Sequence, residues 1–164
     1  MATAVTAVRD IPFTVGGRTF TSRLMVGTGK YPDNATMVHA IEASGAEIVT
    51  VAVRRVDLDR THEDGILHHL DPRRFFLLAN TAGCYTADDA IRYARLAREA
   101  GFNEFIKLEV IGDQETLLPD VQGLLEATRV LVREGFKVMA YTNEDLVAAL
   151  RLGGALVIVG VIVA

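Results

Sequence analysis

A helix end, a glycine and an apolar strand recur in that order three times along this 164-residue chain, and this repeat constrains the fold more than any other feature. The three copies read IEASGAEIVTVAV, AREAGFNEFIKLEV and VREGFKVMAY. Gly45, Gly101 and Gly135 stand where a residue in the left-handed conformation closes many helices. Repeated helix–glycine–strand units predict an α/β fold in which each helix returns the chain to the same sheet.

The strands in these units are nearly continuous apolar runs, which is typical of a parallel sheet whose strands are covered on both faces. Two short runs around Gly16 and Gly17 predict an N-terminal hairpin before the sheet. The strands of the sheet are expected at residues 24–27, 47–53, 75–79, 105–110, 137–141 and 155–163. Helices are expected at residues 34–44, 86–100, 119–134 and 143–152, with a short one at 66–70.

Two architectures fit alternating strands and helices: an open doubly wound sheet and a (β/α)8 barrel. Length alone favours the open sheet, because a complete barrel takes about 250 residues and this chain has 164. The barrel therefore has to be favoured by the chemistry of its strands. In either case we expect residues 1–10 to form a flexible N-terminal arm and residues 11–164 to form a single domain.

The strand FIKLEV places two charged residues on one face. Side chains alternate along a strand, so Phe105, Lys107 and Glu109 share a face and the opposite face is apolar. In an open sheet a helix would cover both charges at a high cost in free energy. In a barrel that face points to the interior, and its C-terminal end opens at the active-site mouth. The charge pattern therefore favours a TIM-type (β/α) barrel.

Lys107 and Glu109 also indicate a chemistry. A lysine removed from water is biased toward its neutral, nucleophilic form, and a neutral amine attacks a carbonyl group to give an imine. Glu109 is placed to move protons on the carbons beside that imine, but it also favours the charged form of the lysine. A buried ion pair or a solvated strand end is the alternative interpretation, and the strand alone leaves both open.

Polar residues end two neighbouring strands at the same rim. Arg54 and Arg55 follow the second strand, and Asn80 and Thr81 follow the third. Arginine binds phosphate through two parallel hydrogen bonds, so we predict that Arg54 and Asn80 contact the substrate. The alternatives are that the arginines face solvent and that Asn80 and Thr81 only terminate their strand.

Composition argues against several classes of protein. The formal net charge is −4 without a long basic run, which gives little support to nucleic-acid or membrane-surface binding. No apolar run approaches the roughly 18–20 residues of a membrane span, and MATAVTAVRD does not resemble a signal peptide. With a single cysteine, Cys84, these features predict a cytoplasmic protein. His62, His68 and His69 lack metal-ligand spacing, so no metal is expected.

Five collinear blocks resemble successive segments of bacterial thiazole synthase. They read GGRTFTSRLMVGTGKY, IEASGAEIVTVAVRR, LLANTAGCYTADDAI, IKLEVIGDQETLLPD and LVREGF, and they cover roughly residues 12 to 152. The resemblance implies a TIM barrel in which Lys107 forms an imine with the ketone of 1-deoxy-D-xylulose 5-phosphate and Glu109 acts as an acid or base. It also implies sulfur transfer from the C-terminal thiocarboxylate of a ubiquitin-like carrier protein, and condensation with dehydroglycine to form the thiazole phosphate of thiamine.

The resemblance further implies a homo-oligomer that uses no metal or organic cofactor. Members of the family continue into a Pro- and Gly-rich loop and two more βα units, whose loops mainly hold the substrate phosphate. This sequence reads RLGGALVIVGVIVA in place of that continuation. We therefore expect an incomplete barrel of about six βα units preceded by the short hairpin.

Three functions stay open on the sequence alone. A thiazole synthase predicts a covalent adduct between Lys107 and the ketose phosphate. A non-catalytic barrel that binds the sulfur carrier or another synthase chain predicts binding without an adduct. A Schiff-base aldolase predicts cleavage of a sugar phosphate without any sulfur donor.

Overall fold

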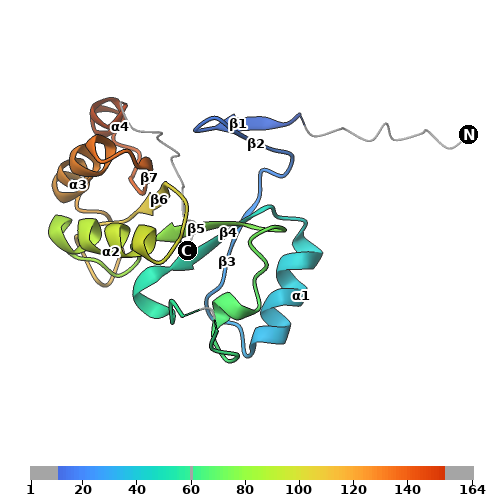
Figure 1. Ribbon diagram of the computed structural model, residues 1–164. Helices are drawn as coiled ribbons and strands as arrows, with labels where there is room; N and C mark the ends of the chain where they lie inside the picture. The colour runs from blue at the N-terminus through green and yellow to red at the C-terminus, as the bar shows by residue number, and fades with distance from the viewer. Residues whose placement is uncertain (1–10, 60, 154–164) are drawn as a thin grey trace, which may run out of the picture.

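The computed structural model describes residues 11–59 and 61–153 of the chain. In these residues an antiparallel hairpin precedes a five-stranded parallel sheet (Figure 1). The strands are β1 (Phe13–Val15), β2 (Arg18–Phe20), β3 (Met25–Gly27), β4 (Ile48–Ala52), β5 (Phe76–Asn80), β6 (Phe105–Leu108) and β7 (Lys137–Ala140). The helices are α1 (Asn34–Ser44), α2 (Ala87–Glu99), α3 (Val121–Arg133) and α4 (Leu146–Leu152), with 3-10 turns η1 (Val53–Arg55) and η2 (Ile66–His68).

Strand order separates the two architectures that the sequence allowed. The sheet runs β3-β4-β5-β6-β7, so every strand pairs with the next one in the chain, and all these pairs are parallel. A doubly wound sheet reverses its order at a switch point, whereas a barrel adds each strand beside the last. The prediction of an incomplete barrel is confirmed. The predicted arm of residues 1–10 and the predicted strand 155–163 lie outside the described residues.

The predicted N-terminal hairpin is also present. Phe13 pairs with Phe20 and Val15 with Arg18. Gly16 and Gly17 join the strands with φ values of 55° and 81°. A two-residue turn with positive φ at both positions matches the right-handed twist of the strands, and glycine adopts it without a steric penalty.

Short polar side chains fix where the helices begin. Each α-helix has an N-cap whose side-chain oxygen accepts hydrogen bonds from the first turn, which satisfies amide groups that lack helical partners: Asp33, Thr86, Asp120 and Asp145. The last helix therefore starts at Leu146 rather than at the predicted residue 143. Within the described residues, no helix has the length and apolar character needed to cross a membrane.

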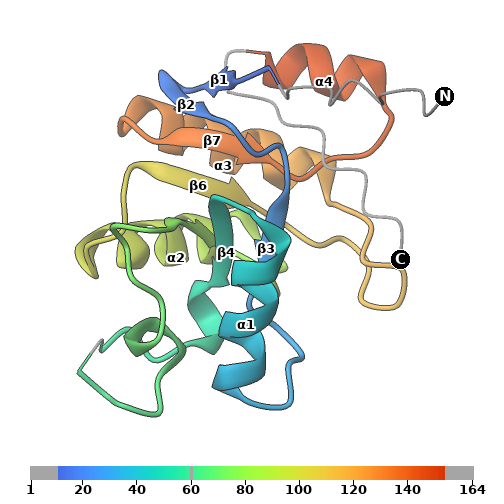
Figure 2. The same ribbon diagram turned by 90° about the vertical axis from the view of Figure 1, so that its right-hand side faces the viewer.

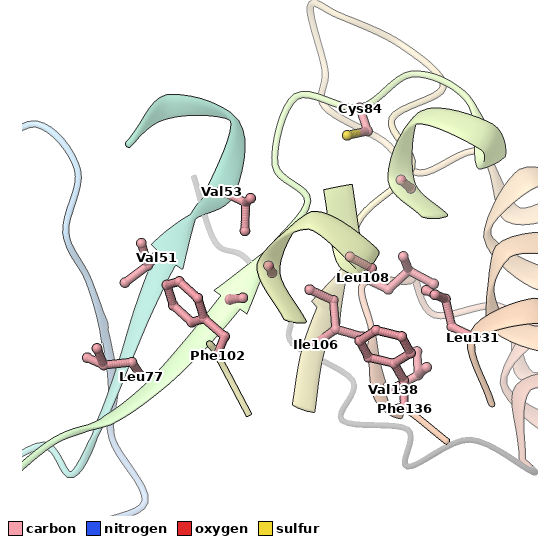
Figure 3. Close-up of a cluster of buried hydrophobic side chains, with 14 of the residues drawn as sticks. Val51, Val53, Leu77, Cys84, Phe102, Ile106, Leu108, Leu131, Phe136 and Val138 are labelled. Carbon is pink, nitrogen blue, oxygen red and sulfur yellow. The ribbon is translucent and has the colours of Figure 1, made fainter. Parts of the chain in front are cut away.

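The helices pack against one face of the sheet and bury a large apolar cluster there. Val51, Leu77, Ile106 and Val138 come from four adjacent strands and are at most 4% exposed. Figure 3 shows Ile106 and Val138 near Leu131 of α3, with Val51 and Leu77 further along the sheet. These side chains occupy alternate positions of their strands, so the next residues along each strand face the other way.

The opposite face of the sheet holds a second apolar cluster at the N-terminal ends of its strands. Phe76, Phe105 and Met139 project from the sheet, and Val15 and Phe20 come from the hairpin to cover them. Figure 1 shows the hairpin on the side of β6 and β7 away from α2 and α3, and Figure 2 shows it above β7. This inner face is therefore filled at one end, and the polar residues predicted from the sequence lie at the other.

Candidate functional site

Lys107 and Glu109 project from the C-terminal end of β6. The Lys107 Nζ donates a hydrogen bond to the Glu109 Oε1 over 2.9 Å. Their side chains are 26% and 10% exposed, so the ammonium retains contact with solvent while the carboxylate is almost enclosed. The sequence-based prediction that both groups share the inner face is confirmed by this contact and by the cavity that both line.

Thr81 holds the backbone of Glu109 in place. Its Oγ1 accepts from the Glu109 N–H over 2.8 Å and donates to the Glu109 carbonyl over 2.8 Å. The Thr81 N–H donates to the Lys107 carbonyl over 3.2 Å. Thr81 is completely buried, so these hydrogen bonds are shielded from water and fix the end of β6 against β5. The sequence placed Thr81 at the rim, but nothing in it indicated this contact.

A cavity of about 260 Å³ lies in front of the Lys107–Glu109 pair. Its walls come from the C-terminal ends of β3, β4, β5 and β6, from residues that follow these strands, and from Ile66 of η2. The lining residues are Gly27, Thr28, Gly29, Thr50, Ala52, Arg55, Val56, Ile66, Asn80, Ala82, Lys107 and Glu109. Four consecutive strands thus open onto one concave site, as a barrel mouth does.

Asn80 presents an amide donor to this cavity. It pairs in register with Lys107 on the next strand and is 7% exposed. The Ala82 N–H donates to its Oδ1 over 3.1 Å, and this contact identifies the oxygen because a backbone amide only donates. Within the described part of the chain its Nδ2 has no acceptor, so that group is available to a bound molecule.

The two predicted rim arginines differ in position. Arg54 donates to the Gly83 carbonyl and is not among the residues that line the cavity, whereas Arg55 lines it. Direct contact between Arg54 and substrate therefore stays a prediction. η1 follows β4 immediately and turns the backbone by about 120° per residue, which brings Arg55 to the cavity.

Tyr141 stands beside the lysine, and the sequence gave no signal for it. Its ring centroid lies 5.8 Å from the Lys107 Nζ, and its hydroxyl donates to the Leu117 carbonyl over 3.1 Å. Burial raises the pKa of the Tyr141 phenol above its ordinary value, and the nearby Glu109 carboxylate raises the pKa further. The phenol therefore stays protonated and links the loop before α3 to the rim of the cavity.

Other reactive side chains lie away from this chemistry. Cys84 is fully buried, and that burial raises the pKa of its thiol to about 11, which keeps it protonated and unreactive at neutral pH. His62 pairs with Asp57 on the surface. In residues 11–59 and 61–153, no three His, Cys, Asp or Glu side chains are grouped to hold a metal ion.

Comparisons with known proteins agree with this geometry. The family model of the thiazole biosynthesis protein ThiG matches residues 14–161. The thiazole synthases of Geotalea uraniireducens and Solibacter usitatus are each 58% identical to this chain, over 84% and 85% of it and 53% and 54% of their own lengths. A chain in the crystal structure of the Amycolatopsis orientalis BexX/CysO complex matches with a TM-score of 0.71 and 28% identity, over 86% of this chain and 57% of that one. The chain thus spans about half the length of the curated relatives it matches.

Proposed function

Because the chain belongs to the family of the thiazole biosynthesis protein ThiG, we propose that its cavity is the imine-forming part of a thiazole synthase active site. Lys107 forms an imine with the ketone of 1-deoxy-D-xylulose 5-phosphate. The reaction ends in the thiazole phosphate of thiamine, made with dehydroglycine and with sulfur from a carrier thiocarboxylate. One observation carries the proposal: an amine and a carboxylate 2.9 Å apart on the wall of a cavity at the barrel mouth.

The ion pair accounts for activation of the amine. A proton passes from the Lys107 Nζ to the Glu109 Oε1 across their direct hydrogen bond, which leaves a neutral amine. That amine adds to the ketone carbon, and the resulting carbinolamine loses water to form a protonated imine. Glu109 returns its proton to the departing hydroxyl, so the carboxylate is ready for a second proton transfer.

The second transfer moves the carbonyl group along the sugar. Glu109 removes a proton from the hydroxyl-bearing sugar carbon next to the imine, and the electron pair is drawn into the imine to give an enaminol. The former imine carbon then gains a proton as the enaminol hydroxyl loses its own, so that the new carbonyl group lies one carbon further along and Lys107 is attached as an amine. Hydrogen bonding from the Asn80 amide orients a sugar hydroxyl during this step. Thr81 acts as a positioning residue because it fixes the backbone of Glu109 and touches no reacting atom.

A protein partner supplies the sulfur in this proposal. The similar solved structure is that of the BexX/CysO complex, in which a chain of this fold is bound to a second protein. We propose that this chain binds a ubiquitin-like sulfur carrier whose C-terminal thiocarboxylate enters the barrel mouth. A homo-oligomeric, cytoplasmic protein without a metal or organic cofactor is part of the same proposal.

Reductive trapping tests the central step. The chain is incubated with 1-deoxy-D-xylulose 5-phosphate, reduced with borohydride and digested for peptide mass spectrometry. One reduced sugar phosphate is expected on the peptide that contains Lys107. The Lys107→Arg variant keeps the charge opposite Glu109 but has no nucleophilic amine, so its adduct is expected to vanish while its melting temperature changes little. Trapping on surface lysines alone would contradict the proposal.

Two further assays separate the other functions that the sequence left open. Capture of the sulfur carrier by a chain that forms no adduct would indicate a non-catalytic barrel. Cleavage of the sugar phosphate without any sulfur donor would indicate an aldolase. We expect carrier binding together with the adduct, and no cleavage.

A further inference from the structure

The charges that line the cavity do not balance. Three of its lining residues have basic or acidic side chains, two basic and one acidic: Arg55, Lys107 and Glu109. Lys107 and Glu109 already form an ion pair with each other. Within residues 11–59 and 61–153, no carboxylate pairs with Arg55. The cavity therefore carries one positive charge that the described part of the chain does not neutralise.

The neighbouring arginine, Arg54, differs from Arg55 in its contacts. The Arg54 guanidinium is occupied by the Gly83 carbonyl. Gly83 has a φ of +83°, and a β-carbon there would lie 3.7 Å from the Arg54 Nη1 and 3.8 Å from the Arg55 Nη2. Both guanidinium groups thus approach the same glycine, but only Arg55 also lines the cavity.

The cavity wall just after β3 leaves room for a ligand beside the backbone. Thr28 turns its hydroxyl to the Thr50 carbonyl over 3.2 Å. Gly29 follows it along the wall, and a β-carbon at Gly29 would meet no atom within 4 Å. A ligand held by Arg55 can therefore lie against this stretch of main chain without displacing a side chain.

We propose that Arg55 binds an oxyanion, the phosphate or carboxylate of a small-molecule substrate, at the β4 side of the cavity. The guanidinium offers parallel N–H donors that match the two oxygens of such a group. The inference rests on the proposed function, because that reaction uses both a sugar phosphate and a carboxylate-bearing imino acid.

Sheet geometry agrees with two binding positions in one cavity. Adjacent strands lie about 4.8 Å apart, so the backbones of β4 and β6 are separated by roughly 10 Å. Arg55 follows β4 and Lys107 lies on β6, and both residues line the same cavity. One position binds the anionic group, and the other holds the carbonyl carbon that reacts.

Calorimetric titration of the whole chain with two simple probes tests the proposal and identifies the anion. Inorganic phosphate represents the sugar phosphate, and oxamate represents the imino acid because it is planar and carries a carboxylate. The variants are Arg55→Gln and Arg55→Lys, with Arg73→Gln, an exposed residue paired with Asp71, as the control.

Arg55→Gln is expected to weaken binding of one probe roughly ten- to a hundredfold. Arg55→Lys is expected to weaken it less because the charge is retained, and Arg73→Gln is expected to bind as the wild type does. The affected probe identifies the source of the anion. Wild-type affinity in both Arg55 variants, no binding of either probe by the wild-type chain, or an equal loss in Arg73→Gln would overturn the proposal.

Borohydride trapping keeps this result separate from the proposed function. An adduct at Lys107 together with unchanged anion binding in Arg55→Gln refutes only the role of Arg55. Anion binding that depends on Arg55 in a chain that forms no adduct refutes only the imine chemistry.

Discussion

The inner face of the sheet has two halves, one apolar and filled with side chains, the other polar and open to a cavity. At the N-terminal ends of the strands, aromatic and aliphatic side chains from the sheet and hairpin fill the space. At the C-terminal ends, Lys107, Glu109 and Asn80 surround an open cavity. Phe105 and Lys107 are two residues apart on one strand, so the change from packed to open takes a single step of the β6 repeat.

The comparison teaches that stability and chemistry depend on different forces within one strand. The lower half is held by apolar contacts, such as the Phe76–Phe105 ring pair with centroids 5.2 Å apart. The upper half is held by hydrogen bonds, above all those of Thr81 with Glu109. Substitutions in the lower half should therefore change stability, whereas those in the upper half should also change reactivity.

The largest loss of stability is expected from Phe105→Ala in the lower half. Phe105 is 3% exposed, and truncation of a buried phenylalanine costs about 3–5 kcal/mol. Urea unfolding measures the loss. The rate of imine trapping, corrected for the folded fraction, should stay within a few-fold of wild type. A much larger fall would contradict the proposal that the lower half contributes stability but not reactivity.

A smaller loss of stability with a clear loss of reactivity is expected from Thr81→Val in the upper half. Valine keeps the shape but leaves the buried N–H and carbonyl of Glu109 without their partner, at a cost of about 1–3 kcal/mol. The rate of trapping at Lys107 should fall because Glu109 is no longer fixed. Thr81→Ser retains the hydroxyl and is the matched control. If Thr81→Val is trapped at the wild-type rate, Thr81 does not position Glu109 for the reaction.

The hairpin turn permits a more selective test of the lower half. At Gly16, with φ of +55°, a β-carbon would lie 2.5 Å from the Phe105 Cζ. At Gly17, with φ of +81°, it would meet nothing within 4 Å. Both alanine variants carry backbone strain, but only Gly16→Ala adds a clash. Its free energy of unfolding should therefore be lower than that of Gly17→Ala by about 1–2 kcal/mol. Equal melting temperatures would show that the turn does not press on Phe105.

The smallest effect is expected from acid and concerns the attachment of the hairpin. Glu47 accepts hydrogen bonds from Thr21 and Ser22, and the Thr21 hydroxyl is the main reason that its pKa lies below the ordinary 4.5. A lowered pKa stabilises the fold above pH 4.5, and this contribution is lost as the pH falls through the folded-state value. Unfolding curves of wild type and Glu47→Gln should therefore converge as the pH falls below 4.5, and a constant difference would contradict this assignment.

The β6 strand shows what the sequence predicts well. Alternation of side chains is a local property of the backbone, so it placed Phe105, Lys107 and Glu109 on one face. The cost of burying that charge under a helix then favoured a barrel over an open sheet, although length alone pointed the other way. The helix-closing glycines were equally local, and all three have positive φ.

The rest of the site depends on contacts that are distant in the sequence. Continued alternation past Ala52 would turn Arg54 inward, but η1 interrupts the strand there and brings Arg55 to the cavity. Tyr141 reaches the rim through a hydrogen bond to Leu117, 24 residues away, and neither end of that contact carries a sequence signal. Such positions follow from the packing of several elements together.

The close approach of Gly16 to Phe105 supports β6 at its N-terminal end. The Phe105 ring lies against the main chain of a tight turn, and the same strand carries Lys107 two positions later. A change in the conformation of that turn would shift Phe105 and, through β6, the Lys107 amine, while the residues that line the cavity stay the same. The hairpin turn is therefore a place where the position of Lys107 could be altered without changing any residue that lines the cavity.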